Sequence, residues 1–86
     1  MKWLPGKDRD GGVQLCGDGH PAYFVSACGK YTVSRALTVL GTRYDGWLRR
    51  VDGRGRTELP IQLVGGVDSA AIAAKACVEH ANGNHP

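Results

Sequence analysis

The chain has 86 residues with 11 Lys or Arg against 8 Asp or Glu, which gives a formal net charge of +3. A chain of this length forms one domain with a thin core and leaves no room for a second folded unit. Its first residues lack the apolar run typical of a secretory signal, none of its apolar runs is long enough to span a bilayer, and its cysteine count of 3 is odd. These features predict a cytoplasmic protein with no membrane partner and no disulfide framework.

The first 22 residues are predicted to form an irregular N-terminal arm. Residues 7–12 mix charge with glycine, and residues 16–21 are dense in turn-forming side chains. The sheet-plus-helix domain is therefore expected to occupy residues 23–86.

The domain is expected to begin with a hairpin. Two short runs rich in β-formers, 23–26 and 31–35, flank a turn at 27–30. Residues 37–40 either extend the second strand or cross to the next one.

A further strand is predicted at residues 43–51, with Tyr44, Trp47 and Val51 as its large apolar positions. If Trp47 and Val51 point toward the core, alternation turns Arg49 inward as well.

Asp52 and Gly53 then predict a hairpin turn, because glycine takes the positive φ that such turns require. In the returning strand, alternation predicts one inward face, formed by Leu59, Ile61 and Leu63. Pro60 lacks an N–H group, which indicates an edge strand or a bulge. The glycine pair at 65–66 is expected to turn the chain into a helix.

A helix is predicted at residues 69–81, with Asp68 or Ser69 as its cap and a stop at Asn82 and Gly83. Helical periodicity places small side chains on the buried stripe: Ala70, Ala73, Ala74, Cys77 and Ala81. Ile72 lies on the opposite, exposed side, either as an ordinary surface isoleucine or as a contact residue. The predicted fold is α+β, a small antiparallel sheet of three to four strands packed on one C-terminal α-helix.

Positive charge is concentrated at the second hairpin, where residues 43–56 hold five arginines and two aspartates. Such a field favours an acidic partner, either a phosphate backbone or a carboxylate-rich protein surface. The charges also have a simpler interpretation, since charged edge hairpins resist aggregation. The candidate binding residues are Arg43, Tyr44, Arg49, Arg50, Arg54, Arg56 and Ile72.

The sequence shows no catalytic constellation, so we expect neither an enzyme nor a cofactor. The nearest candidate consists of two Cys–His pairs, Cys16 with His20 and Cys77 with His80, which could together supply four zinc ligands. Cys77 lies among alanines, however, and is also typical of a small core residue.

Two segments, Trp47–Asp52 and Val64–Ala70, followed by an alanine-rich run at 73–76, resemble the ethylene-response-type DNA-binding domain and the related phage integrase arm-binding domains. The similarity covers residues 43–82. It implies a three-stranded antiparallel sheet on a C-terminal helix, with the sheet face away from the helix entering the DNA major groove through arginines and tryptophans. In this chain Asp52 stands where that family usually has arginine.

The small size, the strand start at 29–33 and the Ala-Lys-Ala-Cys helix are similar to short phage and prophage proteins, a group that includes anti-CRISPR proteins. This resemblance implies a non-enzymatic inhibitor in a bacterial host cell. Its expected partner is a host defence protein or nucleoprotein complex with an acidic surface, which the arginine-rich hairpin contacts. A module that binds DNA directly through the sheet face and the hairpin is the alternative.

Overall fold

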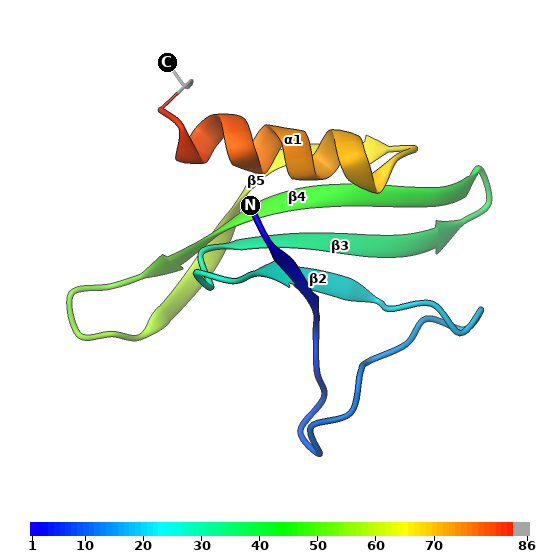
Figure 1. Ribbon diagram of the computed structural model, residues 1–86, viewed down its shortest axis with the longest axis horizontal. Coiled ribbons are helices and arrows are strands. Elements are labelled where there is room, and N and C mark those ends of the chain that lie inside the picture. Colours follow the sequence, from blue (N-terminus) through cyan, green and yellow to red (C-terminus); the bar gives the residue numbers. More distant parts are fainter. Residues whose placement is uncertain (84–86) are drawn as a thin grey trace.

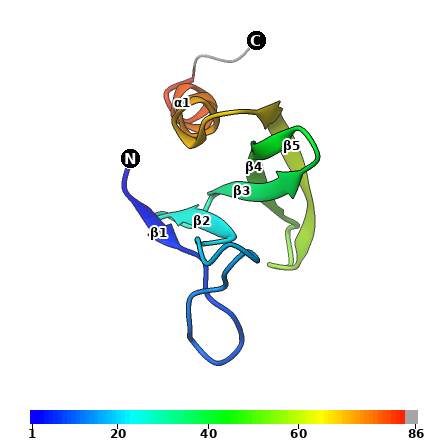
Figure 2. The same cartoon turned by 90° about the vertical axis from the view of Figure 1, so that its right-hand side faces the viewer.

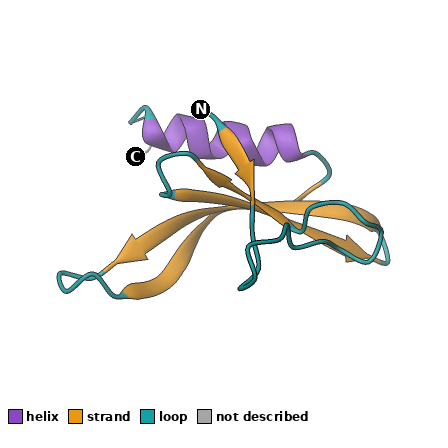
Figure 3. Ribbon diagram, turned by 60° about the horizontal axis from the view of Figure 1, so that its bottom comes forward, coloured by secondary structure: helices purple, strands orange, loops and turns teal. Residues whose placement is uncertain are grey.

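The computed structural model, which describes residues 1–83, contains one antiparallel sheet and one helix (Figure 1). The strands follow one another in the order β1-β2-β3-β4-β5, and the helix α1 lies on one face of the sheet (Figure 3). The α+β class and the C-terminal helix are confirmed, but the sheet has five strands instead of three to four. The elements are β1 (Trp3–Pro5), β2 (Tyr23–Ser26), β3 (Tyr31–Thr38), β4 (Gly41–Val51), β5 (Thr57–Val67) and α1 (Ala70–Ala81).

The unexpected strand is β1, which lies within the predicted irregular arm. It pairs antiparallel with β2, with Trp3 opposite Ser26. Three residues including a proline are too few to show strand alternation, so no pattern in the sequence revealed it. Two isolated antiparallel bridges, Lys7 to Val13 and Leu15 to Pro21, follow it in the same segment.

Of residues 37–40, the first two extend the second strand, which was the first of the two options left by the sequence. β3 continues to Thr38, and Val39 and Leu40 form the turn into β4. The Thr38 hydroxyl donates to the carbonyl of Gly41 at 2.7 Å and accepts from the Leu40 amide at 3.2 Å. β4 therefore begins at Gly41, two residues earlier than predicted.

β5 is an edge strand, as the proline in it indicated, and its pairing with β4 is irregular. Pairing passes from Leu48–Ile61 to Arg50–Glu58, so β5 carries an extra residue beside Pro60. The glycine pair at 65–66 was wrongly expected to end the strand. β5 runs through it to Val67, with Gly66 at φ 66° and its amide donating to the Asp45 carboxylate at 2.8 Å.

The register between β3 and β4 decides which side chains face the helix. Tyr31 pairs with Leu48 and Val33 with Gly46, and Tyr31 and Val33 are buried under α1. Alternate residues of β4 share a face, so Trp47 points to the other side of the sheet. The expectation that Trp47 and Val51 turn inward was wrong, and Arg49 shares their face, which we call the open face.

Small side chains bring α1 close to the sheet, as predicted. Ala73 and Cys77 are fully buried, and Ser69 caps the helix by accepting from the Ala71 amide at 3.2 Å. Ala81, expected on the buried stripe, is exposed. Ile72 is 48% exposed, as the helical periodicity indicated.

The hairpin of β4 and β5 extends beyond the end of α1 (Figure 1). Leu59 and Ile61 were predicted to face inward, but their side chains are 85% and 45% exposed. The extra residue beside Pro60 takes Leu59 out of phase with Ile61, and α1 packs on β3, β4 and the C-terminal part of β5, so nothing within residues 1–83 covers these two residues.

Substitution of Gly46 by alanine is predicted to destabilise the fold by about 1–3 kcal/mol, because the new methyl group overpacks the helix contact. Its carbon would lie 3.0 Å from the Ala73 carbonyl oxygen and 3.3 Å from the Cys77 sulfur. The matched control is Gly53→Ala, whose methyl group would meet nothing within 4 Å. Chemical denaturation measures both variants, and equal stabilities would contradict the proposed close contact.

Candidate binding site

The loop of the β4–β5 hairpin is held in shape by one carboxylate. Asp52 Oδ1 accepts hydrogen bonds from the backbone amides of Arg54 and Arg56, at 2.8 and 2.9 Å. Within residues 1–83, the side chains of Arg54 and Arg56 make no ion pair or hydrogen bond. The loop therefore presents two guanidinium groups on an ordered backbone.

The other two arginines of this hairpin make contacts across the strands. Arg50 forms an ion pair with Glu58 at 3.0 Å, with both side chains at least 40% exposed, so solvent weakens the pair. Arg49 lies on the open face and donates to the Thr57 hydroxyl at 3.5 Å. We call the group Arg49, Arg50, Arg54 and Arg56 the arginine hairpin.

The remaining sequence-predicted site residues lie away from the arginine hairpin. Arg43 and Tyr44 sit near the start of β4, at the opposite end of the strand, and Ile72 is in the first turn of α1 above that same end (Figure 1). Tyr44 faces the helix, where its hydroxyl accepts from Arg35 Nε at 3.4 Å. Arg43 is on the open face and donates to the Thr42 carbonyl at 3.4 Å.

The open face carries a groove of about 460 Å³ that the sequence did not predict. The indole of Trp47 lines it, and the indole Nε1–H donates to the Ser34 hydroxyl at 2.9 Å. Alternation could have placed this tryptophan correctly if Gly46 had been recognised as the position closest to the helix. Tyr23, Thr32, Arg49 and Pro60 also line it.

The walls of the groove come from chain segments far apart in sequence. Gln14 and Ala22 line one side, and Thr57, Glu58 and Pro60 of β5 line the other. Figure 2 shows the N-terminal loop and the β4–β5 hairpin extending below the sheet on either side of β3. The Ala22 amide donates to the Gln14 carbonyl, and the Ala22 carbonyl accepts from the Arg35 amide, both at 2.8 Å.

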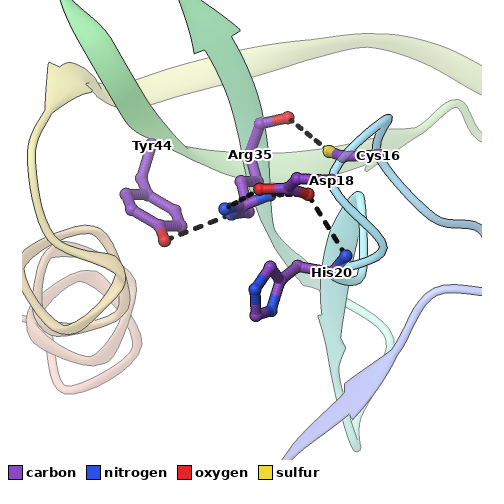
Figure 4. A network of polar contacts seen from close by, with 5 residues as sticks. All are labelled: Cys16, Asp18, His20, Arg35 and Tyr44. Carbon is purple, nitrogen blue, oxygen red and sulfur yellow. Dashed lines mark hydrogen bonds and ion pairs between the residues drawn. The ribbon is translucent and has the colours of Figure 1, made fainter.

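An ion pair fastens the N-terminal wall to the sheet (Figure 4). The two terminal guanidinium nitrogens of Arg35, Nη1 and Nη2, donate to the Asp18 carboxylate at 2.8 and 2.6 Å, and the Arg35 carbonyl accepts a long contact from the Cys16 thiol. The His20 amide also donates to Asp18, at 3.2 Å. The hydrogen bonds from Arg35 lower the pKa of the Asp18 carboxyl from 3.8 to about 2.

The two Cys–His pairs are not brought together as a zinc site. Cys77 is fully buried on the side of α1 that faces the sheet, and this burial raises the pKa of its thiol. His80 Nδ1 lies 2.8 Å from the Tyr31 hydroxyl. Cys16 and His20 belong to the N-terminal loop at the other end of the sheet. Residues 1–83 contain no group of three or more His, Cys, Asp or Glu side chains placed to hold a metal ion.

No helix in that range is long and apolar enough to cross a bilayer.

Replacing Asp18 by asparagine is predicted to lower the melting temperature in a pH-dependent way. Because the pKa of Asp18 is lower in the folded state, its stabilising effect is present above pH 3.8 and is lost as the pH falls to about 2. The difference in melting temperature between wild type and Asp18→Asn should therefore shrink over this interval.

Thermal unfolding followed by circular dichroism between about pH 2 and pH 7 measures this difference. Asp10→Asn is the control, because the Asp10 side chain makes no ion pair or hydrogen bond within residues 1–83. A difference for Asp18→Asn that stays constant down to the acid limit would contradict the role of the ion pair.

Comparison with known proteins supplies no assignment for the groove or the arginine hairpin. No protein-family model, curated protein or solved structure matches the chain. The function proposed below therefore rests on the geometry of the described residues.

Proposed function

We propose that this protein is a non-enzymatic binding module that contacts nucleic acid through the arginine hairpin and the open face of the sheet. One observation carries the proposal. Trp47 and Arg49, two residues apart on β4, both line the open-face groove, and the hydrogen-bonded loop with Arg54 and Arg56 follows at the end of this strand. Arginines supply phosphate contacts, and aromatic rings supply contacts to bases.

The position of Trp47 is the reason for preferring nucleic acid to the protein target expected from sequence. The sequence had predicted that Trp47 and Arg49 face the core, an orientation in which neither side chain could contact a base or a phosphate. Both side chains line the open-face groove instead. Asp45, the acidic residue on this face of β4, binds the Gly66 amide and Gln62 Nε2, so its charge is engaged within the protein.

A phage-type inhibitor that docks on an acidic host protein or nucleoprotein complex is the second candidate, and the exposed apolar residues of the hairpin favour it. Val51, Leu59 and Ile61 are 54%, 85% and 45% exposed and lie among the arginines. Protein interfaces combine such apolar anchors with arginine, whereas phosphate binding has no need of them. An anti-CRISPR-like function belongs to this second candidate.

The double substitution Arg54→Gln with Arg56→Gln is predicted to weaken nucleic-acid binding and to reduce its salt dependence. Each lost phosphate contact lowers the slope of log K against log salt by about 0.7 for single strands and 0.9 for duplexes. Fluorescence anisotropy with labelled oligonucleotides, over a salt titration from about 20 to 200 mM, measures both effects. Thermal stability should stay nearly unchanged, because neither side chain makes an ion pair within residues 1–83.

The matched control is Lys2→Gln with Arg9→Gln, which removes the same charge from two exposed positions in the N-terminal segment. If both double variants lose affinity equally, net charge rather than the arginine hairpin is responsible. If the wild type binds no nucleic acid even at low salt, the proposal fails and the inhibitor becomes the leading candidate. Leu59→Ser with Ile61→Ser should then abolish binding to the protein target.

A further inference from the structure

We infer that the open-face groove holds an unpaired base of a single-stranded nucleic acid stacked on Trp47, with the adjoining phosphates at Arg49 and the arginine hairpin. This inference rests on the proposed function and makes it more specific, because it distinguishes a single strand from a duplex. It also assigns a ligand to a groove that lies beside the hairpin arginines instead of at the loop itself.

The hydrogen bonding of Trp47 favours stacking over the reading of base edges. An indole has a single donor, Nε1–H, and in this protein Ser34 already accepts it at 2.9 Å. The ring is therefore anchored along one edge and has no hydrogen bond left to offer a base pair in the major groove. What it offers a ligand is its aromatic surface, which stacks on any of the bases.

The two walls of the groove also select against a duplex. Trp47 lies between two walls, with Ala22 on the N-terminal side and Pro60 on β5. The faces of paired bases are covered by their neighbours in the duplex, and turning one base out costs a few kcal/mol. A single strand can lower a base between the walls without that cost. The groove volume of about 460 Å³ is also in the range that small-molecule sites use.

Charge along β4 matches a strand that continues from the groove toward the hairpin loop. Arg49 stands two residues from Trp47 on the same face, about 7 Å away along the strand. The one carboxylate in the groove wall, Glu58, is already paired with Arg50 at 3.0 Å. Beyond Arg49 the path leads to Arg54 and Arg56, so the positive charge on this path exceeds the negative charge.

The groove lining is compatible with both DNA and RNA, and the comparison of oligo-dT with oligo-U distinguishes the two. Ala22 and Pro60 present carbon atoms to a bound nucleotide. The side chains of Gln14, Thr57 and Glu58 in the same walls carry polar atoms able to pair with a ribose 2′-hydroxyl, which is the group by which proteins distinguish RNA from DNA.

The test uses Trp47 itself as the probe. In a Trp3→Phe background Trp47 is the single tryptophan of the chain, since the sequence contains 2. Stacking of a base should quench its fluorescence when oligo-dT of about 12 nucleotides is added, a length within the usual site size of sheet-based single-strand binders. Anisotropy with the same oligonucleotide, a duplex of equal length and the corresponding oligo-U gives the three affinities.

We expect oligo-dT to quench Trp47 and to bind at least ten-fold more tightly than the duplex at the same salt concentration. The matched variants are Trp47→Leu, which keeps apolar bulk without an aromatic face, and Trp47→Phe, which keeps a ring. Trp47→Leu should weaken single-strand binding by roughly 5- to 100-fold, the loss expected for one stacked base. Trp47→Phe should stay within about three-fold of wild type, since a smaller ring still stacks.

Three results would overturn the inference. Equal binding of duplex and single strand without quenching of Trp47 would refute the stacked base and leave nucleic-acid binding intact. Binding of oligo-dT by the Trp47→Leu variant as tightly as by the wild type would refute the contact between the base and Trp47. Failure of every oligonucleotide to bind would refute the inference together with the proposed function. Quenching in the Trp3→Phe background gives an answer even if a Trp47 variant fails to fold.

Discussion

The close contact between α1 and β4 at Gly46 is the constraint on which the rest of the structure depends. The helix lies near enough for an added methyl group on Gly46 to meet the carbonyl of Ala73 and the sulfur of Cys77. Helix and sheet can approach this closely only because glycine, alanine and cysteine form both surfaces of the contact. Once Gly46 faces the helix, Tyr44 and Leu48 face it too, and Trp47 must point the other way.

A protein of this size has too few apolar side chains to cover both faces of a five-stranded sheet. Its buried core consists of Tyr31, Val33, Ala73 and Cys77, all on the helix side. The open face is therefore left to partly exposed side chains, with the N-terminal segment folded along one side of it. The Arg35–Asp18 ion pair holds that segment in place, so a surface contact remote from Trp47 shapes the groove in which Trp47 lies.

Local patterns in the sequence predicted most elements of the fold. The helix, its cap at Ser69, the hairpins with turns at 27–30 and 52–56 and the edge position marked by Pro60 all follow from residue types with strong local preferences. The strand β1 could not be predicted in this way, because three residues show no periodicity and its pairing partner β2 is about twenty residues away in the sequence. The strand through Gly65 and Gly66 was missed because a bulge with positive φ has the same residue types as a turn.

The site was less predictable than the fold, since it depends on which of two faces each strand residue occupies. The concentration of arginines was visible in the sequence. The two faces of β4 were exchanged, however, because Trp47 was taken as a core residue. Large size favours burial on average, yet here the smallest residue of β4 decided the orientation. The groove itself joins Gln14, Trp47 and Pro60, and only the folded chain brings such distant positions together.

The irregular outer strand has a consequence for how molecules of this protein meet one another. A regular edge of eleven residues would offer a row of free amides and carbonyls on which a second chain could be stacked in cross-β fashion. Pro60 removes one of those amides, and the extra residues beside it and at Gly65–Gly66 bend the strand, so only short stretches remain in phase. The protein can thus leave Leu59 and Ile61 of this strand exposed while remaining a poor template for fibres.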